Sequence, residues 1–101
     1  MTLQQIREDL REIRYYYAKQ KEFEQAARCG VWNKIVDKIA LYNEAIASAP
    51  MKLYDLYIAL YVQNNSLVAV ADDWDYSDAH MKWLSGQLNK FLLEALGKNG
   101  S

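Results

Sequence analysis

Side chains that could contact a binding partner follow Ser77 at helical spacing. If a helix begins there, Met81 and Leu84 lie on its apolar side, and polar or aromatic side chains project from the opposite side. Side chains of these types can contact base edges and phosphates, and we predict a DNA-binding face made of Ser77, Asp78, His80, Lys82, Trp83 and Gln87. Other outcomes stay open, because a lone exposed His80 can have no role, and Trp83 could anchor a protein partner or pack in the core.

An acidic cluster just before this stretch raises the question of catalysis. Asp72 and Asp73 are adjacent in a predicted helix, so their carboxylates point about 100° apart. No cluster of histidine or cysteine accompanies them, and the only histidine and the only cysteine are 51 residues apart. There is also no glycine-rich phosphate-binding loop. We therefore predict no catalytic residue, no metal site and no cofactor, and a protein that is not an enzyme.

The residues around this stretch fit a helix-turn-helix. Apolar residues recur at spacings of three and four on both sides of a polar break, namely Leu67, Val70, Trp74, Met81, Leu84 and Leu88. Ala71 supplies the small side chain that two steeply crossing helices need, and the Ser77 hydroxyl can cap the second helix. Asp75 stands where such turns most often have glycine, and aspartate tolerates the left-handed backbone. An ordinary helical hairpin in a small bundle is the alternative.

The remaining sequence predicts an all-α fold. We expect five helices, over residues 3–28, 32–49, 51–63, 67–74 and 78–96. Thr2 with Gln5, Ser66 and Ser77 mark helix starts, Asn64-Asn65 a break, and Gly30 and Gly97 helix ends. The charged residues Arg7, Glu8, Arg11, Glu12 and Arg14 should form a solvated outer face of the first helix, and Lys52, Asp55 and Gln63 that of the third.

We predict one domain over residues 1–101. Residues 1–49 form an antiparallel helical hairpin, residues 50–97 hold the helix-turn-helix, and residues 98–101 form a frayed tail. The long apolar seam of the hairpin is either a dimer surface or is covered by the third and last helices. The single Cys29 cannot form an internal disulfide, and no signal peptide or membrane span is visible, so we expect a cytoplasmic protein without membrane contact.

The charge distribution disfavours tight DNA binding by a single chain. Residues 1–50 carry eight basic against seven acidic side chains, whereas residues 51–101 carry four lysines against six acidic side chains. A lone DNA-binding module normally concentrates positive charge on its reading face, because neutralised phosphates supply much of the affinity. A positive surface around Lys82 and Trp83 would favour nucleic acid as the partner, and a negative one would favour protein.

Four short segments carry a resemblance to a known family. They are AIASAP at residues 45–50, LYDLY at 53–57, LYV at 60–62 and ADDWDYS at 71–77. Residues 45–96 resemble late-gene regulators of the ArpU/RinA type from phages and prophages of Gram-positive bacteria. The resemblance implies an all-α fold, a helix-turn-helix similar to that of sigma-factor region 4, and a reading helix that begins at Ser77. Asp75 in place of glycine and the acidic Asp78 depart from the family pattern.

Two function classes follow. The first is a phage or mobile-element transcriptional regulator that binds DNA as a homodimer or alongside host RNA polymerase. The second is a protein-interaction module on a degenerate helix-turn-helix scaffold, and a small oligomeric phage structural or accessory protein is a third alternative.

Overall fold

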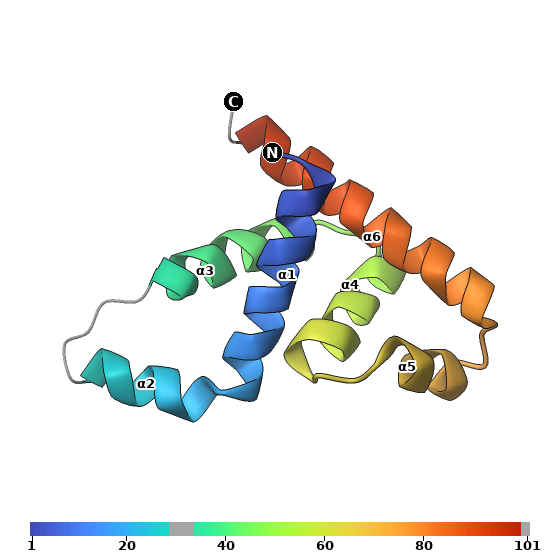
Figure 1. Ribbon diagram of the computed structural model, residues 1–101. Coiled ribbons are helices and arrows are strands. Elements are labelled where there is room, and N and C mark those ends of the chain that lie inside the picture. Colours follow the sequence, from blue (N-terminus) through green and yellow to red (C-terminus); the bar gives the residue numbers. More distant parts are fainter. Residues whose placement is uncertain (29–33, 100–101) are drawn as a thin grey trace.

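All regular secondary structure in the described part of the chain is helical. A computed structural model describes residues 1–28 and 34–99, and within them there is no strand, which confirms the all-α prediction (Figure 1). These two described ranges form six α-helices and one π-helical segment, close to the five helices expected. They are α1 (Leu3–Ala18), α2 (Gln20–Arg28), α3 (Lys34–Ala47), α4 (Met51–Tyr57), η1 (Ile58–Val62, the π-helix), α5 (Leu67–Asp73) and α6 (Asp78–Asn99).

The long helix α6 is the element on which most of the others pack. Its buried residues recur at spacings of three and four, which places them on one stripe: Met81, Leu84, Leu88, Leu92 and Leu96. Helices α1, α3, α4 and α5 all contact α6, which in Figure 1 runs from the turn after α5 to the end of the chain near the N-terminus. Residues from both halves of the chain therefore share one hydrophobic core.

The apolar seam of the N-terminal helices is covered within the chain. On α1 the buried side chains are Ile6, Leu10 and Ile13, and on α3 they are Ile39, Tyr42 and Ile46. These helices pack against each other and against α6, while α4 covers α3 and η1 covers α1. The described residues show most of this seam covered within the chain, whereas Tyr15, Val36 and Leu41 remain exposed, and the dimer surface stays a prediction. Residues 32 and 33, where the second helix was predicted to begin, lie outside the described residues.

A buried carboxylate joins α1 to α3. Asp9 is almost fully buried, and it accepts hydrogen bonds from the Tyr42 hydroxyl at 2.7 Å and from Gln5 Nε2 at 3.0 Å. Lys38 Nζ lies 3.0 Å from Asp9 and 2.6 Å from Glu12. Since later residues of α3 pair with earlier residues of α1, the two helices run in opposite directions where they touch. Burial and the Asp9 carboxylate raise the pKa of Tyr42, so its hydroxyl remains a donor.

The N-terminal helix is interrupted, contrary to the prediction of one helix to Arg28. The break falls at Lys19, whose backbone N–H donates to the carbonyls of both Tyr15 and Tyr16. A shared hydrogen bond of this kind is common at helix termini. The polar run from Lys19 to Lys21 gives the chain no apolar contact that would hold the helix straight. The helix end expected at Cys29-Gly30 lies outside the described residues.

Two other expectations for the chain were wrong. Gly97 does not end the last helix, because α6 continues to Asn99; a glycine inside a helix costs only about 1 kcal/mol and does not prevent it. Lys98 and Asn99, which were expected in the frayed tail, therefore belong to α6. Arg14 is not simply solvated either, since its guanidinium donates to the carbonyls of Asn64 and Asn65 at 3.3 and 3.4 Å.

The third helix changes its winding halfway. Residues 51–63, expected as one α-helix, form α4 and then η1, where Gln63 N–H donates to the Ile58 carbonyl five residues earlier at 2.9 Å. Asn65 N–H reaches back to the Ala59 carbonyl at 3.0 Å, and Asn64 adopts the left-handed backbone with φ 60°. The wide π-turn and the asparagine break are what carry the chain from η1 into α5.

Two buried tyrosines should respond in opposite ways to loss of their hydroxyl. Tyr42→Phe removes a donor from a buried carboxylate and should lower the free energy of unfolding by about 1–3 kcal/mol. Tyr57 is equally buried, but its hydroxyl has no hydrogen-bond partner among the described residues. Tyr57→Phe should therefore leave stability unchanged or raise it by up to ~1 kcal/mol. Urea unfolding of both variants measures the difference, and equal destabilisation would contradict it.

Candidate helix-turn-helix surface

The turn between α5 and α6 has the geometry that the sequence predicts. Asp75 adopts the left-handed backbone with φ 57°. The N–H of Tyr76 donates to the Ala71 carbonyl at 2.8 Å, and the N–H of Asp75 donates to the Asp72 carbonyl at 3.3 Å. This pair of hydrogen bonds is the Schellman motif, which ends α5 after Trp74 and redirects the chain.

The beginning of α6 is fixed by the predicted cap. Ser77 Oγ accepts a hydrogen bond from the backbone N–H of His80 at 3.1 Å. Ser66 caps α5 and Thr2 caps α1 in the same way, so all three predicted caps are confirmed. Val70 and Ala71 of α5 are buried in the same core as Met81 of α6, and the two helices are in contact. Helix α5 therefore packs on α6 across this turn, as the predicted helix-turn-helix requires.

The predicted DNA-facing residues separate into exposed, capping and half-buried groups. Asp78, His80, Lys82 and Trp83 are exposed over the first two turns of α6. The Trp83 side chain has 57% of its area accessible, so it is outside the core. Ser77 is exposed too, but its hydroxyl is used by the cap, while Gln87 is half-buried.

Aromatic rings form a continuous row across this surface. Trp74 meets Tyr76 edge to face at a centroid distance of 6.0 Å, and Tyr76 meets His80 edge to face at 4.7 Å. His80 then stacks on Trp83 at 5.7 Å with an interplanar angle of 26°. We call Trp74, Tyr76, His80 and Trp83 the aromatic row. The spacings of four and three between the last three residues could have predicted the row, although Trp74 and Tyr76 were not among the predicted site residues.

Lys52 of α4 is held against the start of the aromatic row. Its Nζ lies 5.1 Å from the Trp74 ring centroid and 5.2 Å from that of Tyr76, within the range of cation–π attraction. The residue is exposed, as predicted, but its ammonium group rests on two rings. No sequence pattern predicted this contact, because residues 52 and 74 are brought together only by the tertiary fold.

The charge on this surface is predominantly negative. Four exposed aspartates lie along the end of α5, the turn and the first turn of α6: Asp72, Asp73, Asp75 and Asp78. Lys82 is the nearest basic side chain in sequence, and the Lys52 ammonium is engaged by the two rings. Among the described residues, no group of three or more histidine, cysteine, aspartate or glutamate side chains is arranged to hold a metal ion.

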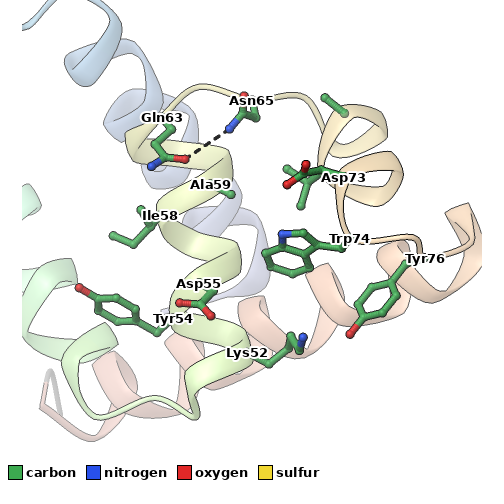
Figure 2. Close-up of a pocket in the computed structure, with 12 residues that line it drawn as sticks. Lys52, Tyr54, Asp55, Ile58, Ala59, Gln63, Asn65, Asp73, Trp74 and Tyr76 are labelled. Atoms are coloured by element: carbon green, nitrogen blue, oxygen red, sulfur yellow. Dashed lines mark hydrogen bonds between the residues drawn. The ribbon is translucent and has the colours of Figure 1, made fainter.

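A groove opens beside the aromatic row, between α4–η1 and α5. It has a volume of about 920 Å³, and Figure 2 shows its lining residues. One wall carries Asp55, Ile58 and Ala59 from α4 and η1, and the other carries Asp73 and Trp74 from the end of α5. The sequence pattern placed Asp55 on the outer face of its helix, and it is exposed, but no pattern could bring Asp55 and Asp73 to one groove.

No family model, curated protein or solved structure matches this sequence. Within residues 1–28 and 34–99, none of the helices has the length and apolar character needed to cross a membrane.

The left-handed turn makes a prediction about glycine. Asp75→Gly removes the steric cost of φ 57° and should keep or raise the free energy of unfolding, whereas Asp75→Ala should lower it by about 0.5–1 kcal/mol. Asp72, inside α5, is the matched control, since there alanine should be better than glycine by about 0.5–1 kcal/mol. Urea unfolding measures the free energy of unfolding of the four variants, alanine and glycine at position 75 and at position 72. If the alanine variant is more stable than the glycine variant at position 75 as well, the left-handed backbone of Asp75 is contradicted.

Proposed function

We propose that this protein is a helix-turn-helix regulator that binds DNA through the first two turns of α6. The observation that carries the proposal is the turn at Asp75, which ends α5 and starts a capped α6 with His80, Lys82 and Trp83 facing outward. A helix presented in this way by a preceding packed helix has the form that enters the major groove. The resemblance of residues 45–96 to ArpU/RinA-type regulators supports a role in phage or mobile-element transcription.

The exposed side chains have different capacities on such a face. Lys82 can pair with a phosphate or with guanine, and His80 can hydrogen-bond to either. Asp78 can accept a hydrogen bond from the cytosine amino group but repels phosphates. Ser77 is committed to the helix cap and Gln87 is half-buried, so these two predicted residues contribute least.

The charge balance sets how DNA binding would work. Strong binding to a DNA site needs on the order of 6–10 phosphate contacts. Among the α6 side chains whose exposure is described, the exposed lysines are Lys82 on the proposed DNA-binding face and Lys90 further along the helix, which are too few for that number of contacts. The four exposed aspartates around the turn between α5 and α6 repel the DNA phosphates. We therefore propose that two chains act together as a homodimer, or that the protein binds next to RNA polymerase, so that additional basic groups enter the complex.

A DNA titration tests this function. Fragments of the neighbouring genomic region are titrated by gel shift at two salt concentrations. We expect a sequence-selective complex that Lys82→Ala weakens, with the slope of log affinity against log salt reduced by about 1. Lys21→Ala removes an exposed charge on α2 and serves as the matched control. The absence of a selective complex at micromolar protein contradicts the proposal.

A second function is favoured by the acidic surface and by Trp83. Negative charge around an exposed tryptophan suits a protein partner, such as host RNA polymerase, better than a nucleic acid. In this function the aromatic row docks on the partner and the helix-turn-helix serves as a scaffold.

Trp83→Ala distinguishes this second function. A pull-down from host lysate followed by mass spectrometry should recover a defined partner, and Trp83→Ala should weaken its binding by at least about 2 kcal/mol, as for a central interface residue. Met51→Ala, which shortens an apolar side chain with 79% of its area exposed on α4, is the control. A partner that binds the Trp83→Ala variant as tightly as the parent protein does not use this surface.

A further inference from the structure

The groove between α4–η1 and α5 combines aromatic surface with acidic side chains. Trp74 and Tyr76 form its aromatic part, and Asp55 and Asp73 come from its opposite walls, as Figure 2 shows. Both carboxylates are exposed. With Lys52 as the basic residue of the lining, the groove carries two negative charges against one positive charge.

The groove already accommodates one cation of the protein itself. The Lys52 ammonium group rests over Trp74 and Tyr76 at 5.1 and 5.2 Å from their centroids. The long, flexible lysine side chain has no hydrogen bond or ion pair that fixes it there among the interactions described for it. This contact shows that the aromatic surface can receive an alkylammonium group, and that a second cation would compete with Lys52.

We propose that this groove binds a lysine- or arginine-rich peptide segment of a partner protein. One basic side chain of the peptide takes the place of the Lys52 ammonium on Trp74 and Tyr76. Neighbouring basic side chains pair with Asp55 and Asp73. The excess of carboxylates at the groove and at the adjoining turn attracts a basic peptide and repels a nucleic acid, so charge complementarity selects this occupant.

This inference goes beyond the proposed DNA binding, because it concerns the groove and not the first turns of α6; with the aromatic row of the second function the groove shares Trp74 and Tyr76. DNA binding is measured through Lys82, which is not part of the groove lining. Loss of one activity therefore leaves the other measurable.

Synthetic hexalysine and hexaarginine provide the probes. They are titrated into ¹⁵N-labelled protein near physiological salt, with an uncharged Gly-Ser hexamer as the control peptide. We expect the Trp74 indole N–H and the amides of Asp55 and Asp73 to shift. Asp55→Asn and Asp73→Asn should each weaken binding about two- to five-fold, the range of one exposed ion pair. Lys52→Gln should strengthen binding about two- to five-fold, because the competing ammonium is removed.

Asp72→Asn is the matched control. Asp72 precedes Asp73 in α5 and is exposed, but it does not line the groove. If Asp72→Asn weakens binding as much as Asp73→Asn, the peptide is held by diffuse charge and the groove proposal is wrong. Weaker binding by Lys52→Gln also overturns the proposal, and so does binding of single-stranded oligonucleotides with shifts at the same groove residues. Circular dichroism confirms that each variant is folded.

Discussion

Burial of the apolar stripe of α6 is the constraint on which the rest of the structure depends. The stripe from Met81 to Leu96 is the surface against which α1, α3, α4 and α5 pack. A helix of 22 residues that is buried along one side must leave the other side in solvent. The exposed side of its first two turns holds His80, Lys82 and Trp83, so the same packing that forms the core presents the candidate binding face.

The turn before α6 fixes the direction of that face. Two backbone hydrogen bonds around Asp75 end α5, whose C-cap residue is Trp74. Ser77, only three residues after Trp74, caps the start of α6. A short connection with a defined left-handed residue leaves little freedom between the two helices. The scaffold is therefore well specified by local interactions, whereas its charge is not that of an ordinary DNA-binding surface. Fold and electrostatics point to different partners, and this is the reason for two candidate functions on one face.

The features that could be predicted from the sequence are those with local causes. A serine or threonine three residues before its N–H donor predicted the caps at Thr2, Ser66 and Ser77, and the spacing of apolar residues predicted the buried stripes. Asp75 stands where such turns most often have glycine, and it was expected to tolerate the left-handed backbone that it adopts. The break at Lys19 and the π-turn of η1 were missed, since neither contains the proline or glycine that usually marks such a change, and each consists of a change in the carbonyl to which a backbone N–H donates.

Features formed between distant segments could not be predicted in this way. The burial of Asp9 requires Tyr42 and Lys38 from another helix, and Arg14 leaves the predicted solvated face because the carbonyls of Asn64 and Asn65 lie within reach. The groove and the position of Lys52 arise from the same kind of tertiary contact. Tyr76 then connects the two candidate surfaces, because its ring contacts Lys52 toward the groove and His80 toward α6. The ring of Tyr76 therefore belongs both to the lining of the groove and to the aromatic row that continues along α6.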